Sequence, residues 1–223
     1  MCTMKYGEMA LMNALIDKMG GMRGVKRFLS GELVLVEKST QIAAKLDWRK
    51  VYKALGMITE YDSEIASLAI SEQEGLWTIP VLKGVTCNKV VASIKESGGS
   101  IHSNYDVVLF NDRSPNNDGS YSVCFKQNIE ADEENKNLSA DSLRNKEVKG
   151  ITLLERLLLG FGYLLATGSN LDKEGFTRCA GSRDSNDNVP IMYCDYDNSV
   201  YVTSFCSDGG DNMRTRSVVS CQP

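Results

Sequence analysis

Residues 150–168, GITLLERLLLGFGYLLATG, form the most regular stretch of the chain and predict its longest helix. Large apolar side chains recur at the spacing of one helix face, at Leu153, Leu157, Phe161 and Leu164. Gly168 closes the pattern. Charged residues interrupt the run at Glu155 and Arg156, and the run is too short to span a bilayer. We therefore predict a buried amphipathic helix.

The elements around this helix change character along the chain. Residues 1–74 show mainly helical patterns, whereas strand patterns dominate from Trp77 onward. A second helix is predicted between the N-cap Thr86 and the stop signal Gly98. Strand patterns occur at residues 77–82, 105–110, 119–128, 176–183, 189–193, 199–205 and 214–220. Together these patterns predict an α+β fold with a helical N-terminal region at 1–74 and a second domain at 75–223.

Two shorter signals lie between the predicted helices. The Asn-Asp-Gly-rich cluster at residues 111–120 is of the kind that hairpins use, and it predicts a turn between the strands at 105–110 and 119–128. Ser139 caps a predicted short helix at 139–146.

Composition and charge argue against several classes of function. The 223 residues have a net charge of -4, and phosphate neutralisation needs a basic surface, so we expect no nucleic-acid binding. Glu8 and Asp17 interrupt the apolar stretch near the N-terminus, and the apolar core of a secretory signal would not tolerate such acidic residues. We therefore expect a cytoplasmic protein without membrane insertion. The seven cysteines include no CxxC pair, and we expect free thiols.

No pattern predicts a catalytic centre, a metal site or a cofactor. His102 is the only histidine, and no nucleophile pattern lies near it in the sequence. Residues 183–188, RDSNDN, have the rhythm of a calcium loop. An EF-hand loop then requires Gly and Glu where this chain has Val189 and Asp195, so a polar turn is the better interpretation.

The composition of residues 191–212, IMYCDYDNSVYVTSFCSDGGDN, is unusual. The stretch contains no Lys, Glu, Gln or Trp and only one Met, Met192. If each adenine of an AAC or AAT codon is replaced by any base, the codons reached encode none of these five residue types. The scarcity of these five residue types suggests that codons in this segment were altered at adenines. The alternative interpretation is a polar surface loop of fixed sequence.

The phrases that frame this stretch resemble the variable proteins of diversity-generating retroelements. These phrases are residues 150–172, CAGSR at 179–183, NVP at 188–190, VYV at 200–202 and MRTRSVVS at 213–220. The resemblance covers residues 77–223 and implies a C-type-lectin-like fold of the formylglycine-generating-enzyme type. In that layout a helix matched by TCNKVVASIKESGG precedes one matched by TLLERLLLGF, and Thr215 stands where the closing phrase has Ala.

The resemblance also implies a function and a set of site residues. Such proteins are not enzymes but display a diversified ligand-binding face encoded near the 3′ end of the gene, here at about residues 189–220. It implies inward positions at Val189, Pro190, Met192, Val200, Val202 and the strand RSVVS. It implies outward, ligand-binding positions at Ile191, Tyr193, Cys194, Asp195, Tyr196, Thr203, Ser204, Phe205, Cys206, Ser207, Asp208 and Asn212. The expected partner is a protein, and the helical region at 1–74 orients or oligomerises the display domain.

Three alternatives remain open at this stage. A formylglycine-generating-type enzyme shares the scaffold and holds copper between two cysteines, for which Cys194 and Cys206 are the candidates in this chain. A calcium-dependent carbohydrate binder would need Glu-Pro-Asn-type and Trp-Asn-Asp-type motifs, which the sequence lacks. A fixed surface without diversification is the third possibility.

Overall fold

The computed structural model describes residue 16 and residues 21–30, 44–68, 70, 73–103, 109–205 and 212–220. The chain divides into two compact units, Met1–Ile42 and Ala43–Pro223. In the first unit, the described helix is α2 (Gly21–Leu29). Of the predicted helical region, residues 1–15, 17–20 and 31–43 lie outside the described residues. Within the described part, no helix is both long and apolar enough to cross a membrane.

The predicted long helix forms as α8 (Leu153–Thr167) and provides much of the core of the second unit. Thr152 caps its start, because its hydroxyl accepts a hydrogen bond from the Glu155 backbone N–H (3.3 Å) while the Glu155 carboxylate accepts one from the Thr152 N–H (2.8 Å). Gly168 ends the helix in the left-handed conformation, at a φ of 70°. The sequence identifies Gly168 as the end of this helix, whereas the cap at Thr152 is recognised only in the structure.

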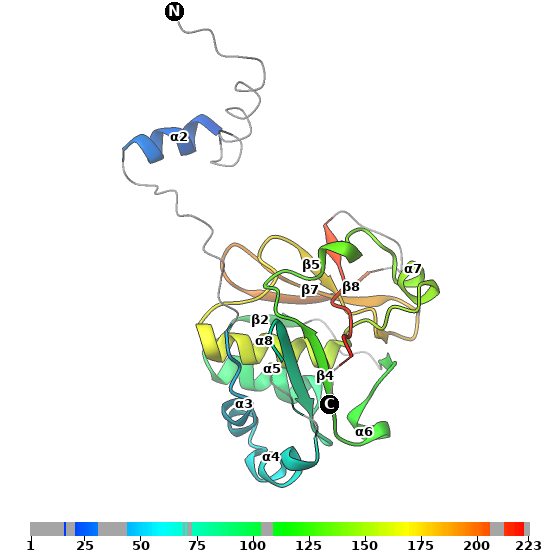
Figure 1. Cartoon of the computed structure of the whole chain (residues 1–223). Coiled ribbons are helices and arrows are strands. Elements are labelled where there is room, and N and C mark those ends of the chain that lie inside the picture. Colours follow the sequence, from blue (N-terminus) through cyan, green and yellow to red (C-terminus); the bar gives the residue numbers. More distant parts are fainter. Residues whose placement is uncertain are drawn as a thin grey trace, which may run out of the picture. The chain divides into compact units, whose positions relative to one another are not determined.

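A five-stranded sheet of mixed direction lies beside α8 in Figure 1. Its strands run in the order β2 (Ile101–Ser103), β8 (Val200–Phe205), β7 (Val189–Cys194), β5 (Phe176–Arg178) and β9 (Met213–Arg214). In the register of β7 and β8, Met192 lies opposite Val202, and both side chains join the hydrophobic core. Side chains alternate between the faces of a strand, so Tyr193 and Tyr201 lie on the other face.

Helix α5 (Cys87–Glu96) packs against α8 and β2. Its N-cap is Thr86, whose hydroxyl accepts a hydrogen bond from the Lys89 N–H, as the sequence predicts. The short helix α7 (Ala140–Asn145) begins after its predicted cap Ser139. The structure therefore confirms the α+β fold with several helices and mixed sheets.

A pair of strands completes the core and differs from the predicted hairpin. Strand β4 (Tyr121–Lys126) pairs with β1 (Leu76–Val81), so that Phe125 lies opposite Trp77 and Val123 opposite Ile79. Strand β3 (Phe110–Asn111) pairs instead with β6 (Ser182–Arg183). The predicted hairpin between residues 105–110 and 119–128 is wrong because the connecting segment forms the helical turn α6 (Pro115–Asp118) and β4 places its apolar side chains opposite those of β1.

The second unit also includes helices that the sequence places in the N-terminal region. Helix α3 (Trp48–Ala54) buries Val51 and Tyr52, and α4 (Ile58–Glu64) continues into a short 3-10 turn, Ile65–Ser67. The Tyr52 hydroxyl donates to the Pro80 carbonyl (2.8 Å) and so ties α3 to β1. A side-chain carbon at Gly162 of α8 would lie 3.3 Å from the Trp48 ring, so Gly162 lets α3 approach closely.

A buried ion network joins α8 to the C-terminal segment. The Asp172 carboxylate accepts hydrogen bonds from Arg156 of α8 (2.6 and 3.0 Å) and from Arg216 (2.8 Å). It also accepts one from the Thr177 hydroxyl of β5. The three charged side chains are at most 2% exposed. Burial opposes ionisation of Asp172, but the two guanidinium groups outweigh it and lower the pKa of the carboxyl group below its ordinary 3.8.

A second buried carboxylate holds the start of the same helix. Beyond its capping role, Glu155 accepts two hydrogen bonds from Arg113 (2.8 and 2.9 Å) and one from the Tyr121 hydroxyl (3.0 Å). Arg113 also donates to the Gly150 carbonyl (2.8 Å). Glu155 and Arg156 interrupt the apolar run in the sequence because each forms one of these buried ion pairs.

We predict that Asp172→Asn lowers the free energy of unfolding by about 3–5 kcal/mol at neutral pH, since it leaves two buried guanidinium groups without a counter-charge. Asn tolerates the left-handed backbone at this position, where φ is 58°. The native pKa of Asp172 is lowered, so its stabilising contribution is complete above the unfolded-state pKa and is lost as the pH falls through the native-state pKa. The difference between variant and wild type therefore shrinks only below about pH 4.

Urea unfolding across this pH range measures the effect. The control is Asp62→Asn, which removes an exposed partner of Arg49 and should cost less than about 1 kcal/mol. An equal loss in the two variants would contradict the role assigned to Asp172.

Candidate functional site

Four aromatic rings form a row across the outer face of the five-stranded sheet. Phe176 packs edge-on against Tyr193, with ring centroids 4.9 Å apart. Tyr193 stacks on Tyr201 at 5.2 Å, and Tyr201 stacks on His102 at 4.8 Å. We call these four residues the aromatic row. They come from β5, β7, β8 and β2, which are successive neighbours in the sheet.

The strand register explains this alignment. Tyr193 lies directly opposite Tyr201 in the antiparallel pair of β7 and β8, and Tyr201 lies opposite His102 in the parallel pair of β8 and β2. Residues directly opposite each other on neighbouring strands point to the same face and their side chains meet. None of the four side chains is fully buried. The row is therefore a partly exposed aromatic surface on a hydrogen-bonded frame.

The hairpin that joins β7 to β8 extends the row with acidic and aromatic side chains. The Asp195 N–H donates to the Ser199 carbonyl and the Asn198 N–H to the Asp195 carbonyl, both at 2.9 Å. Asn198 adopts the left-handed conformation that such a tight turn requires, at a φ of 63°. Tyr196 lies at the tip of the hairpin and is fully exposed. The tip thus presents Asp195, Tyr196 and Asp197 to solvent.

Charges at the tip act on the nearest ring. Hydrogen bonds from Ser199, with a smaller contribution from the nearby His102, lower the pKa of Asp197, so this carboxylate is ionised at neutral pH. Partial burial and the negative charges of Asp197 and Asp195 raise the pKa of Tyr201, whose phenol therefore stays protonated. The hairpin tip therefore places negative charge beside the part of the aromatic row that contains Tyr201.

A cavity of about 460 Å³ lies between the hairpin and the segment that precedes β5. Its walls include three aromatic rings, Phe176, Tyr193 and Tyr196, and the carboxylate of Asp195. Lys173 and Glu174, of opposite charge, belong to the same lining. The cavity is large enough for one side chain of a partner molecule.

The structure brings part of the expected ligand-binding set to this region. Tyr193 and Thr203 are half-buried on the outer face, while Asp195 and Tyr196 are exposed at the hairpin. Asn212 is exposed beside the Phe176 end of the row, where its carbonyl accepts the Phe176 N–H (3.2 Å). These expected positions therefore surround the aromatic row. The Phe205 side chain and residues 206–208, with Cys206, Ser207 and Asp208, lie outside the described part of the structure.

Two positions expected to point outward are buried. Ile191 is 2% exposed because it lies opposite Arg178 in a covered part of the sheet, where the Arg178 guanidinium donates to the Leu138 carbonyl. Cys194 is 7% exposed because strand alternation places it on the face of Met192 and Val200. The expected exposure of both residues is therefore wrong: Ile191 shares the face of Tyr193 but is covered, whereas Cys194 lies on the inner face.

A third position is exposed on the other side of the sheet. Ser204 is exposed, but strand alternation places it on the face of Val202 rather than that of Thr203. Among the expected inward positions, Val189, Pro190, Met192, Val200 and Val202 are buried, although alternation places Val189 on the face of Tyr193. In the phrase RSVVS, which was also expected to face inward, only Arg216 is buried and Ser220 is exposed.

The sequence-based set omits three members of the aromatic row, Phe176, His102 and Tyr201. Strand alternation contains a signal for Tyr201, because Val200 and Val202 were expected to face inward and the residue between them must then face outward. His102 and Phe176 are distant in sequence from β7 and β8. Only the pairing of the strands brings them into the row.

The cysteines do not all match the expectation of free thiols. Cys87, Cys179 and Cys194 are free, but Cys124 is disulfide-bonded, so the expectation is wrong for Cys124. Burial raises the pKa of the Cys194 thiol, which disfavours the thiolate that binds metals. Within the described residues, no group of three or more His, Cys, Asp or Glu side chains is placed to hold a metal ion.

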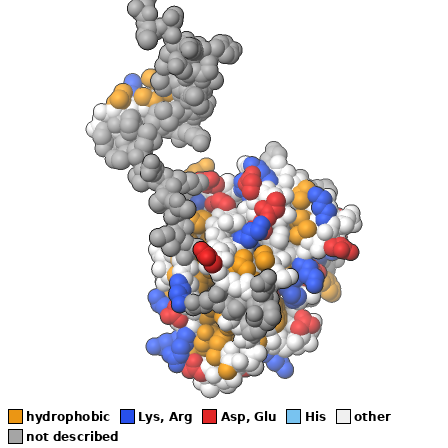
Figure 2. Space-filling model, viewed as in Figure 1, with side chains coloured by type: hydrophobic (Ala, Val, Ile, Leu, Met, Phe, Trp, Pro, Cys, Tyr) orange, Lys and Arg blue, Asp and Glu red, His pale blue; other side chains and the backbone are white. Residues whose placement is uncertain are grey.

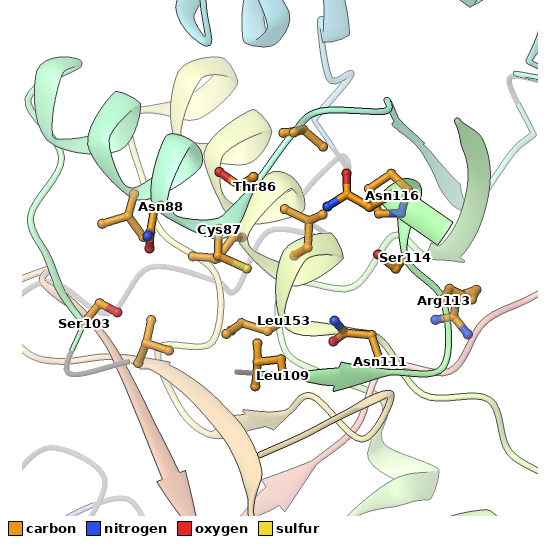
Figure 3. Close-up of a pocket in the computed structure, with 16 residues that line it drawn as sticks. Thr86, Cys87, Asn88, Ser103, Leu109, Asn111, Arg113, Ser114, Asn116 and Leu153 are labelled. Atoms are coloured by element: carbon orange, nitrogen blue, oxygen red, sulfur yellow. The ribbon is translucent and has the colours of Figure 1, made fainter. Parts of the chain in front are cut away.

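A separate cavity of about 450 Å³ lies between the start of α5 and residues 109–116 (Figure 3). Its floor includes Leu153 and Leu157 of α8, and its polar lining includes Asn88 and Asn111. The thiol of Cys87 also lines it, and burial raises the pKa of this thiol to about 11. A thiol with this pKa is a poor nucleophile at neutral pH.

Comparisons with protein-family models, with curated proteins and with solved structures find no significant match for this chain.

We predict a coupling energy of about 0.5–1.5 kcal/mol between Tyr193 and Tyr201, the range for stacked aromatic pairs. The measurement is urea unfolding of the wild type, Tyr193→Ala, Tyr201→Ala and the double variant. Tyr196→Ala combined with Tyr201→Ala is the matched control, because Tyr196 is fully exposed and should add independently. Equal coupling energies in the two cycles would show that stacking of Tyr193 on Tyr201 contributes no specific free energy to folding.

Proposed function

We propose that this chain is a non-enzymatic binding protein that displays a diversified face on a C-type-lectin-like scaffold, as the target protein of a diversity-generating retroelement. One observation carries the proposal. The aromatic row and the exposed hairpin draw Tyr193, Asp195, Tyr196 and Tyr201 from residues 191–212, the segment whose composition fits codons altered at adenines.

The chemistry of the face supports protein binding. Tyr side chains bring large contact areas at a low cost in conformational entropy, while Thr, Asn and Asp offer adaptable hydrogen bonds. The exposed and half-buried side chains of this face are of these types, with Thr203 beside the row and Asn198 in the hairpin. Antibody binding surfaces use the same combination.

The pairing of β7 with β8 beneath this face supports the proposal that the outer side chains can be substituted repeatedly. Strands β7 and β8 are fixed by six cross-strand residue pairs, and their inner side chains Met192 and Val202 belong to the core. The Cys194 N–H donates to the carbonyl of Asp172 (3.0 Å), so the buried ion network holds the end of β7 as well. Outer side chains can therefore change without loss of the frame.

The arrangement of the helices supports the C-type-lectin-like assignment. Helices α5 and α8 correspond to the two helix phrases of the resemblance and pack against each other. The phrase RSVVS contributes Arg216 to the buried network and Val219 to a bridge with Cys124 of β4. The chain's last described residues are thereby joined to the strand pair β1–β4.

We predict that a library randomised at Tyr193, Asp195, Tyr196 and Thr203 remains folded and yields binders. Substitutions at exposed sites usually change stability by less than about 0.5 kcal/mol. The library is displayed on phage and selected separately against purified ubiquitin, thioredoxin and serum albumin. Thermal unfolding of randomly picked members measures the tolerance.

A matched library randomised at Met192, Val200 and Val202 should lose folding, because each large-to-small change in the core costs about 1–5 kcal/mol. The proposal fails if the outer library unfolds as often as this inner library, or if it yields no binders to any of the three proteins.

A further inference from the structure

The cavity beside the hairpin has a lining suited to one class of side chain. Phe176, Tyr193 and Tyr196 supply aromatic rings, and the Asp195 carboxylate lies among them. Aromatic rings grouped around a cavity attract cations through the negative potential of their faces, and a carboxylate adds direct charge attraction. The combination favours a cationic group that has an apolar stem.

The hairpin tip strengthens this preference. Asp195 and Asp197 flank the fully exposed Tyr196 in the sequence, and both carboxylates are exposed. Each already accepts one backbone hydrogen bond through Oδ1, Asp195 from Tyr196 (2.7 Å) and Asp197 from Ser199 (2.9 Å). These bonds fix the carboxylate positions. After partial burial, the charges of both carboxylates also raise the pKa of Tyr201, so they act on the neighbouring part of the aromatic row.

The remaining charges of the cavity do not cancel this effect. Lys173 contributes one positive charge and the adjacent Glu174 one negative charge to the lining. Because these two charges offset each other, Asp195 is the excess charge of the lining, while Asp197 lies outside the lining on the same hairpin. On the surface shown in Figure 2, by contrast, acidic and basic side chains are interspersed over the larger unit.

We propose that this cavity receives an arginine or lysine side chain of the partner protein. Its charged end lies against Asp195, with Asp197 of the same hairpin as a second attraction from outside the lining, and its apolar stem packs on Tyr193 and Tyr196. The inference rests on the proposed binding function and adds the chemistry of the partner. It also predicts that binding weakens as salt concentration rises, because exposed charges are screened.

The test uses the full chain, immobilised, and a random peptide library displayed on phage. We expect selected peptides to be enriched in Arg and Lys relative to the unselected library. Their affinity should fall roughly three- to thirtyfold on Asp195→Asn, the range for loss of a cation–aromatic and charge contact, and less on Asp197→Asn, because Asp197 does not line the cavity. Asn retains the oxygen that accepts the backbone hydrogen bond, so the hairpin is preserved in both variants.

Control variants separate this inference from the proposed function. Glu96→Gln removes an exposed carboxylate from α5 and should leave peptide binding unchanged. Peptides without Arg or Lys enrichment that bind Asp195→Asn normally but lose binding to Tyr193→Ala would overturn the cationic partner and leave the binding face intact. If no peptide is selected, or if the selected peptides bind every variant equally, both proposals are contradicted.

Discussion

The buried pairing of Asp172 with Arg156 and Arg216 is the interaction on which the rest of the fold depends. It joins the first turn of α8 and the segment after that helix to the C-terminal segment, which lies 44 residues beyond Asp172. Arg216 also donates to the carbonyls of Asn128 (2.6 Å) and Ile129 (2.7 Å), next to β4. Buried charges are costly when unpaired, so this arrangement strongly disfavours any packing that separates its members.

The network also bears on the proposed diversification, because it fixes the strands whose outer side chains would vary. Asp172 holds β5 through the Thr177 hydroxyl and β7 through the Cys194 N–H, so both strands are fixed from the inner side. The aromatic row and the hairpin lie on the outer side and contribute few contacts to the core. Under the proposed function, stability and recognition would therefore reside in different residues of the same strands, as a display scaffold requires.

The sequence predicts those features that depend on local patterns. Gly168 marks the end of α8, Thr86 the start of α5 and Ser139 the start of α7. The resemblance, rather than a local pattern, places Val200 and Val202 on the inner face of β8. Features that depend on distant partners were missed. The pairing of β3 with β6, the stacking of His102 on Tyr201 and the burial of Ile191 beside Arg178 each need a strand register that no local pattern contains.

The most direct test of the central claim is to sequence the DNA that flanks the gene. The account predicts a second, non-coding copy of the segment encoding residues 189–220, with a reverse transcriptase gene nearby. Differences between the copy and the gene should occur only where the copy has adenine, and they should fall at outer positions such as Tyr193 and Tyr196 rather than at Met192 or Val202. The absence of such a copy and of the reverse transcriptase gene, or differences concentrated at the inner positions, would contradict the account.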